Sequence, residues 1–321
     1  MKRIADRLLI SALLLLALAV PVRAAGMLVP VGEVIGLELR GDSVTVSAFD
    51  RSLPAGQAAG LRIGDEILSI DGSAIDCAED IRHALNRSDG DVDLVVSRDG
   101  RETRVRVEPA VTPDGPRLGV YLRQGVTGIG TITFYDPATR CFGTLGHGVN
   151  DQTGALLSMT EGSAFPAGVV SVDRGRAGQP GQLRGCLSGD RLLGTVSRNT
   201  EQGVFGTLHG AVTGEAIPVA AAEEVRTGPA TIRSTVDGAG PRDYSVEILK
   251  IYPKDRSDGR NLLLRVTDPA LLEATGGIVQ GMSGSPILQH GKLVGAVTHV
   301  LVNQPDTGYG IFIENMLEAA S

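Results

Sequence analysis

The sequence GMSGSPI occupies residues 281–287 and is followed at once by LQHGKLVGAVTHV at residues 288–300. A serine between glycines can lie on a tight turn with its hydroxyl exposed, because glycine adopts backbone conformations that a Cβ would obstruct. In such a turn the N–H groups of Gly281 and Ser283 converge on one place, where they can bind a developing oxyanion. The second stretch predicts a hairpin whose last strand can pair with an extended peptide. The pattern favours Ser283 as a nucleophile and Ser285 as a structural turn residue.

A serine hydroxyl becomes an effective nucleophile only beside a base. The five histidines of the chain are His83, His147, His209, His290 and His299. His147 follows a strand-like segment and lies between Gly146 and Gly148, which let neighbouring backbone approach closely. His147 is therefore the candidate base, and His209 is the alternative.

The third member of such a site is expected to be a carboxylate that holds the imidazole in the correct tautomer. Asp268 follows a strand-like segment at residues 262–267 and precedes Pro269. Aspartate followed by proline is equally typical of a helix N-cap, so the spacing alone leaves both roles open. The other carboxylate candidates are Asp136, Asp151 and Asp306.

The part of the chain from residue 118 onward alternates short strand-like runs with glycine-rich turns. It shows no long helical periodicity before Pro269, which predicts an all-β barrel or sandwich. The composition agrees, because 43 glycines and 16 prolines among 321 residues, without a collagen repeat, indicate many turns.

A separate module precedes this β region. The stretch LPAGQAAGLRIGDEILSIDG at residues 53–72 predicts a short helix, a strand and a hairpin turn, and residues 79–86 predict a second helix. The module resembles the PDZ domains of bacterial exported proteases. The resemblance implies a groove between a strand at residues 34–39 and the second helix, where a peptide C-terminus adds as a strand. Ile35, Gly36 and Leu37 would then receive its carboxylate through their backbone.

The N-terminal residues 1–25 carry Lys2, Arg3 and Arg7 before an apolar run and end in small residues, which is typical of an export signal. The run is shorter than a bilayer-spanning helix, which favours a cleaved signal over an N-terminal anchor.

Other chemistries find little support in the composition. A net charge of −7 and an aromatic content of 3% argue against binding of nucleic acid. The three cysteines form no metal-binding pair, and no phosphate-binding loop or flavin signature is present, so neither a metal nor a cofactor is expected. Cys141 and Cys186 can form a disulfide in an exported protein or remain thiols.

Longer motifs around the candidate residues carry a family resemblance. They are GTLGH ending at His147, VTDPALL around Asp268, GGIVQGMSGSPI around Ser283 and GYGIFIENML ending at Leu317. The chain resembles the stage IV sporulation protein B peptidases, which are exported PDZ-bearing serine peptidases of endospore-forming bacteria. The resemblance implies a chymotrypsin-like double β-barrel, with Ser283 as nucleophile, His147 as general base and Asp268 as its orienting residue.

The same resemblance implies a biological role. The exported enzyme would cleave itself in its N-terminal region and then cut a membrane-complex regulator in the space around the forespore. That cut would release an intramembrane protease that activates the mother-cell sigma factor.

The expected protein is mainly β and has four parts. Residues 1–25 are a signal or anchor, 30–108 an α+β PDZ domain, 109–117 a linker, and 118–321 the serine peptidase domain. The expected partners are a protein substrate in a membrane-bound complex and, at the PDZ groove, peptide C-termini or the chain's own N-terminal region. The alternative function is a non-catalytic exported adaptor that binds peptide C-termini.

Overall fold

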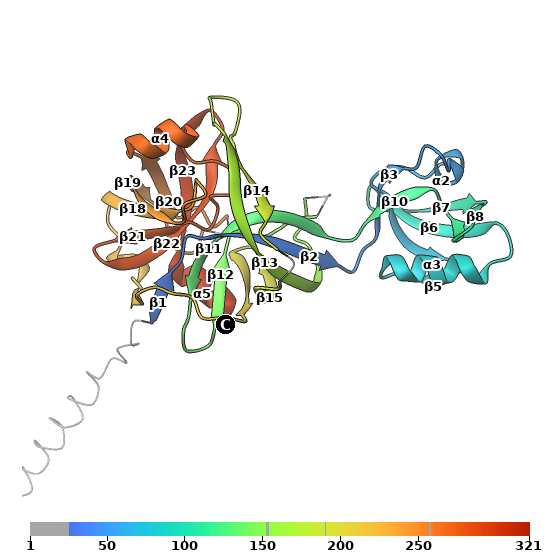
Figure 1. Cartoon of the computed structure of the whole chain (residues 1–321), viewed down its shortest axis with the longest axis horizontal. Coiled ribbons are helices and arrows are strands. Elements are labelled where there is room, and N and C mark those ends of the chain that lie inside the picture. Colours follow the sequence, from blue (N-terminus) through green and yellow to red (C-terminus); the bar gives the residue numbers. More distant parts are fainter. Residues whose placement is uncertain (1–25, 152–153, 190, 257) are drawn as a thin grey trace, which may run out of the picture.

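In a computed structural model of the chain, residues 26–151, 154–189, 191–256 and 258–321 are described. The expected export signal, residues 1–25, lies outside them. The described residues form two adjoining barrels and a smaller α+β unit, which a narrow neck joins to the first barrel (Figure 1). Among these residues no helix is both long and apolar enough to cross a membrane.

The first barrel is a ring of six antiparallel strands in the order β12-β16-β15-β13-β2-β11, which closes because β11 also pairs with β12. The strands are β2 (Val34–Gly41), β11 (Val126–Tyr135), β12 (Cys141–Thr144), β13 (Met159–Asp173), β15 (Gly194–Thr200) and β16 (Gly203–Leu208). Three further strands extend this sheet, namely β1 (Met27–Pro30), β14 (Gln182–Leu187) and β17 (Ile217–Pro218). Ile35, Leu39, Phe142 and Val204 are buried in its core.

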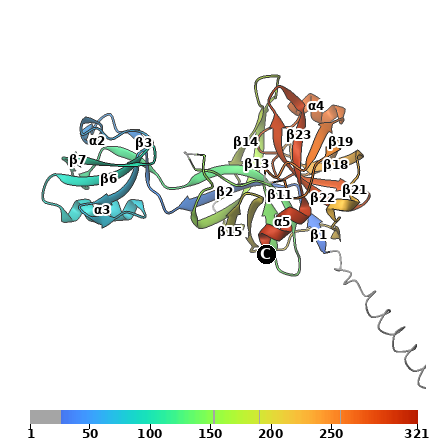
Figure 2. The ribbon, with the colours of Figure 1, turned by 180° about the vertical axis from the view of Figure 1, so that it is seen from behind.

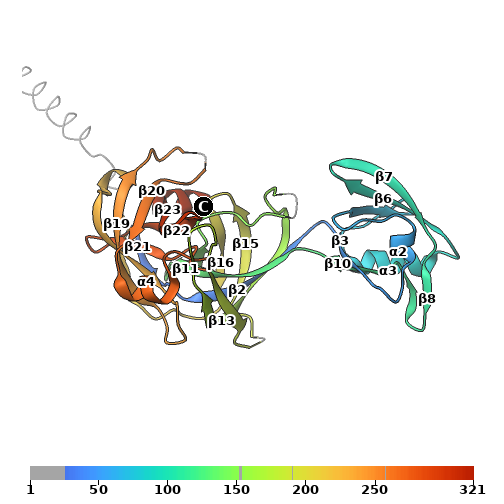
Figure 3. The same ribbon diagram turned by 90° about the horizontal axis from the view of Figure 1, so that it is seen from above.

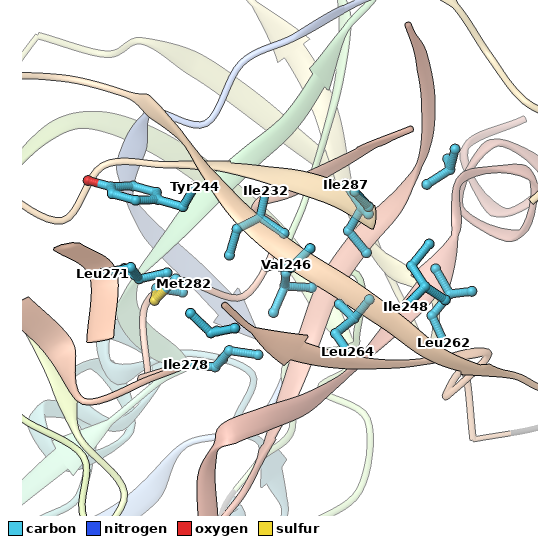
Figure 4. Packing of buried hydrophobic residues seen from close by; sticks show 14 of the residues in the cluster. Ile232, Tyr244, Val246, Ile248, Leu262, Leu264, Leu271, Ile278, Met282 and Ile287 are labelled. Carbon is cyan, nitrogen blue, oxygen red and sulfur yellow. The ribbon is translucent and has the colours of Figure 1, made fainter. Parts of the chain in front are cut away.

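The second barrel is closed in the order β18-β19-β20-β23-β22-β21. Its strands are β18 (Gly228–Ser234), β19 (Arg242–Ile251), β20 (Leu262–Val266), β21 (Pro286–Gln289), β22 (Lys292–Leu301) and β23 (Gln304–Phe312). Aliphatic side chains from facing strands meet in its core, among them Ile232, Val246, Leu264 and Ile287 (Figure 4). The expected double β-barrel is therefore present.

Three short helices accompany the barrels. They are η1 (Ala222–Glu224), α4 (Pro269–Thr275) and α5 (Ile313–Ala320). Helix α5 lies against β22, as the view from behind shows (Figure 2). Its inward residues Ile313 and Met316 are buried.

The α+β unit has the expected PDZ elements. Its strands and helices are β3 (Thr45–Phe49), α2 (Ala55–Ala58), β4 (Glu66–Ile70), β5 (Ser73–Ala74), α3 (Ala78–Arg87), β6 (Val92–Arg98), β7 (Arg101–Val107), β8 (Ala110–Thr112), β9 (Gly115–Arg117) and β10 (Val120–Arg123). Helix α3 is amphipathic, and its residues Ile81, Ala84 and Leu85 are buried against strands of the unit.

The strand pairing sets the ends of this unit differently from the predicted residues 30–108. Strand β2, which was expected to form the PDZ groove, pairs with β11 on one edge and β13 on the other and belongs to the first barrel. The expected linker, residues 109–117, contains the β8–β9 hairpin of the PDZ unit. Strand β10 then pairs with β3, and Leu118 enters the PDZ core. The PDZ unit is thus an insertion between β2 and β11 of the barrel.

The two chain crossings between the PDZ unit and the barrel run side by side (Figure 3). The side chain of Gln124, between β10 and β11, bridges them. Its Nε2 donates to the carbonyl of Asp76 at 2.9 Å, before α3, and to that of Gly41 at 3.3 Å, at the end of β2. Its Oε1 accepts from the N–H of Ala78 at 3.4 Å. One side chain therefore ties the start of the PDZ helix to the barrel.

Candidate active site

A cavity of about 450 Å³ opens between the two barrels. His147 comes from the loop after β12 in the first barrel, and Ser283 comes from the loop before β21 in the second. Both line the cavity together with His299 on β22. The structure therefore brings the candidate nucleophile and the candidate base into one site.

The nucleophile loop is held by the residues on either side of Ser283. Met282 is fully buried in the core of the second barrel (Figure 4). Gly281 and Gly284 both have a φ of +95°, a conformation that disfavours any residue with a Cβ. The N–H of Thr131, on β11, donates to the carbonyl of Ser283 at 3.0 Å. The loop is thus fixed from both barrels.

The N–H groups of Gly281 and Ser283 donate no hydrogen bond to any described residue. They are therefore available to an oxygen placed in the cavity, which is what an oxyanion hole requires. The hydroxyl of Ser283 donates to the carbonyl of Thr298 at 2.8 Å. To react, the hydroxyl has to leave that carbonyl and donate to the base.

His147 is partly buried and follows Gly146 and Leu145, and the φ of 66° at Leu145 is strained for a residue with a side chain. Its Nδ1 lies 2.9 Å from the carbonyl of Gly148, so the tautomer with the proton on Nδ1 donates to it. That tautomer leaves Nε2 bare and able to accept a proton. Burial lowers the pKa of His147 below its usual 6.5, although the bond to Gly148 opposes the shift.

The ring of His299 lies beside that of His147, with 5.2 Å between centroids and a tilt of 40°. Burial, the nearby His147 and Arg260 together lower the pKa of His299 to about 4. At neutral pH the cavity therefore holds two uncharged imidazoles. Sequence reasoning gave His299 no role, because it appeared only as part of a strand.

Asp268 does not line this cavity. One of its carboxylate oxygens accepts from the N–H groups of Ala270 and Leu271 at 3.0 and 3.1 Å, which makes Asp268 the N-cap of α4. The other oxygen accepts from the N–H of Ser245 at 3.2 Å. The structure thus shows the capping role that the Asp-Pro sequence allowed, and the role of Asp268 in orienting His147 stays a prediction.

The remaining candidates lie elsewhere. Asp136 bonds within its own turn, and Asp306 accepts from the hydroxyl of Thr307 at 3.1 Å. Asp151 does not line the cavity. His209 is exposed, and its Nε2 lies 3.0 Å from the hydroxyl of Thr195.

The structure also places Ser285 and the two cysteines Cys141 and Cys186. Ser285 is buried and bonds the hydroxyl of Ser234 at 3.0 Å, in agreement with a structural role. Cys141 and Cys186 are both free thiols.

Ile35, Gly36 and Leu37, which were expected to form the PDZ groove, lie on β2 in the first barrel and not beside α3. Ile35 and Leu37 are buried in the first barrel, and Leu37 lines the cavity between the two barrels. A cavity of about 300 Å³ opens instead between α3 and β10, lined on its apolar side by Ile81, Leu85, Leu118, Val120 and Leu122. β10 is the edge strand of its sheet, so its outer edge can accept an added strand.

Two family profiles match the sequence of this chain. The sequence profile described as SpoIVB peptidase S55 matches residues 115–317, which is more than half of the chain. The chain belongs to the SpoIVB peptidase S55 family. A PDZ-domain profile matches residues 34–108. The protein is thus a serine endopeptidase that carries a PDZ domain, and the resemblance seen in its motifs is confirmed.

Solved structures similar to this S55 peptidase include proteases and a PDZ domain. The active form of the Rv3671c protease from M. tuberculosis is 14% identical, covers 62% of this chain and 75% of its own, and has a TM-score of 0.37. The HtrA-type protease AlgW, solved with a decapeptide, is 14% identical, covers 64% of this chain and 56% of its own, and has a TM-score of 0.36. The PDZ domain of the SdrC-like protein from Listeria monocytogenes is 22% identical, covers 25% of this chain and 87% of its own, and has a TM-score of 0.22.

Proposed function

We propose that Ser283 is the nucleophile of this peptidase and that His147 is its general base and then its general acid. The observation that supports this assignment is the shared cavity, which both side chains line together with Gly281, and the N–H groups of Gly281 and Ser283 donate to no described residue. His147 Nε2 takes the proton of the Ser283 hydroxyl as Oγ bonds the scissile carbonyl carbon. The two N–H groups stabilise the negative oxygen. The imidazolium then gives its proton to the leaving amine, and a water molecule deacylates the serine by the reverse route.

Substrate binding prepares this step. The carbonyl of Thr298 holds the hydroxyl of Ser283 on the strand β22, beside the cavity. An extended peptide laid along β22 would offer its own N–H groups to carbonyls of that strand. The N–H groups of the peptide then compete for the carbonyl of Thr298, which frees the hydroxyl of Ser283 to turn toward His147.

The PDZ unit binds peptide C-termini at the groove between α3 and β10. The apolar lining accepts an apolar terminal side chain, and the edge of β10 provides main-chain pairing. The N–H groups of Leu118 and Gly119 donate to no described residue, which suits them to the terminal carboxylate. The ligand is a tail of the substrate or of a partner protein and regulates cleavage.

The enzyme acts after export, in the space around the forespore. The N-terminal residues 1–25 provide the export signal or a membrane tether. There the enzyme cleaves its own N-terminal region and then a regulator in a membrane complex, which releases the intramembrane protease for the mother-cell sigma factor. This role rests on membership of the S55 family.

Two N-terminal sequences test self-cleavage. The wild-type protein and the Ser283→Ala variant are exported, purified and sequenced from their N-termini. The wild type is expected to begin further along the chain, and before Met27, because β1 is paired with β11 and β17. Identical N-termini in both proteins would contradict self-cleavage.

A matched pair of peptides tests whether the groove between α3 and β10 recognises a C-terminal carboxylate. A fluorescent peptide with an apolar C-terminal residue should bind as the free acid and lose most of its affinity as the C-terminal amide. Fluorescence anisotropy with the full chain measures both. Equal binding of the two forms would exclude recognition of a terminal carboxylate.

A further inference from the structure

Arg260, in the loop between β19 and β20, has a guanidinium without a partner. No hydrogen bond or ion pair joins that guanidinium to a described residue, and its Nε is enclosed. The five other arginines from residue 226 onward each pair with a carboxylate or donate to a carbonyl, namely Arg226, Arg233, Arg242, Arg256 and Arg265. An enclosed donor without a partner is costly and calls for an explanation.

Arg260 lies on the same side of the second barrel as the candidate base. Its guanidinium carbon is 5.3 Å from the ring centroid of Tyr309 on β23. Tyr309 lies opposite His299 on β22, so the two side chains share one face of the sheet, and the ring of His299 lies beside that of His147. After burial and the nearby His147, the charge of Arg260 is a third cause of the low pKa of His299. The unpaired cation is therefore a near neighbour of the cavity.

The loop that carries Arg260 is bonded to the barrel through the next residue. Asn261 is fully buried, and its side-chain amide donates to the carbonyls of Pro253 and Lys254 at 2.8 and 3.3 Å. The N–H of Asn261 donates to the carbonyl of Gly310 on β23 at 2.9 Å. The position of Arg260 is thus fixed in advance, which lowers the entropy that a ligand has to overcome on binding.

The acidic residues nearby do not neutralise Arg260. The two oxygens of Asp258 accept from Arg256 at 2.5 and 2.8 Å. This bonding to Arg256 lowers the pKa of Asp258 to about 2, so at neutral pH its carboxylate is ionised and already paired. The described lining of the cavity contains no aspartate or glutamate. A carboxylate that enters the cavity therefore meets no like charge in its lining and has an unpaired cation beside it.

An extended substrate would pass this face of the barrel. Strand β21 pairs with β22 only as far as Ala296, so the following edge of β22 has no strand partner among the described residues. On that edge the carbonyl of Thr298 accepts from the hydroxyl of Ser283. In a strand added there, the residue level with His299 directs its side chain to the face on which His299 lies. That face is the one beside Arg260.

We propose that Arg260 is a specificity-determining residue that binds the carboxylate of an aspartate or glutamate close to the scissile bond of the substrate. This inference rests on the proposed function and adds a substrate class to it. A guanidinium offers two parallel N–H donors to the two oxygens of a carboxylate. A charge-assisted bond of this kind changes affinity by about 10- to 100-fold. The peptidase therefore selects chain segments that carry an acidic side chain at this position.

Peptide cleavage by the full chain tests the proposal. Sequences cleaved from a digest of a bacterial proteome should show an excess of Asp or Glu at one position near the cut. One such sequence is then synthesised with both ends blocked, so that only the side chain carries a carboxylate, in a Glu and a Gln form. The wild-type kcat/KM should be about 10-fold higher or more for the Glu form. Arg260→Gln should bring this ratio close to one, and Arg260→Glu should favour a Lys form of the peptide.

Arg265→Gln is the matched control. Arg265 is exposed on β20, two residues beyond Leu263, but its charge is already paired with Glu247 at 2.6 Å. The preference of this variant for the Glu form should equal that of the wild type. A wild-type ratio near one, or an unchanged ratio in folded Arg260→Gln and Arg260→Glu, would overturn the proposal. Cleavage of the digest by Ser283→Ala at the wild-type rate would instead contradict the proposed function.

Discussion

Replacing Ser283 by alanine is expected to lower proteolysis of an unfolded test protein by roughly 10⁴- to 10⁶-fold, because the covalent step loses its nucleophile. The fold should be unchanged, since the side chain is partly exposed and its single hydrogen bond goes to the carbonyl of Thr298. Cleavage rates and circular dichroism of the purified full chain measure the two effects. A variant that folds normally and retains even a tenth of the activity would show that Ser283 is not the nucleophile.

The double variant Ser283→Ala/His147→Ala sharpens this test. Residues that act as one catalytic unit are strongly non-additive, so the second substitution should cost little beyond the first. A further large loss in the double variant would indicate that His147 acts in a step that does not involve Ser283.

The Gly284→Ala substitution is expected to destabilise the peptidase by roughly 3 kcal/mol and to lower its melting temperature by about 10 °C. A Cβ at this position would lie 2.0 Å from the carbonyl oxygen of Thr131 and 2.6 Å from the backbone nitrogen of Leu145, and the φ of +95° adds strain. Both neighbours are backbone atoms of the first barrel, so the nucleophile loop has to move away from the His147 loop. Activity should fall together with stability.

Gly210→Ala is the matched control for this experiment. A Cβ at Gly210 meets no atom within 4 Å, and its backbone needs no positive φ. Its melting temperature should stay close to that of the wild type. Equal effects of the two alanines, measured by thermal unfolding, would contradict the steric argument.

Local sequence signals predicted the turns of the site better than the partners of its strands. The glycines around Ser283 and His147 indicated tight turns, and the structure places both residues in one cavity. Asp268 could not be assigned in this way, because a cap and an orienting carboxylate share the same local sequence. Its bonds to Ala270, Leu271 and Ser245 show that it caps α4.

Strand pairing explains the other differences between the predictions and the structure. The apolar alternation of residues 34–39 correctly indicates a strand, but the pattern carries no information about which sheet the strand joins. Its partners β11 and β13 lie far along the chain. Thr131, which bonds the nucleophile loop from the first barrel, is likewise far from Ser283 in the sequence. The edge strand of the PDZ unit likewise comes from residues after its expected end. The place of His299 beside His147 depends on the pairing of β22 with β23 and has no local signature.

The insertion of the PDZ unit between β2 and β11 has a practical consequence for dissecting the enzyme. A truncation that starts the chain after Arg123 would remove β1 and β2 along with the PDZ unit and open the first barrel. A single proteolytic cut in the neck would not release the PDZ unit either, because the uncut crossing still holds it. A PDZ-free enzyme requires excision of the whole insert and a short turn that joins Gly41 to Gly125, so that β2 and β11 become a hairpin.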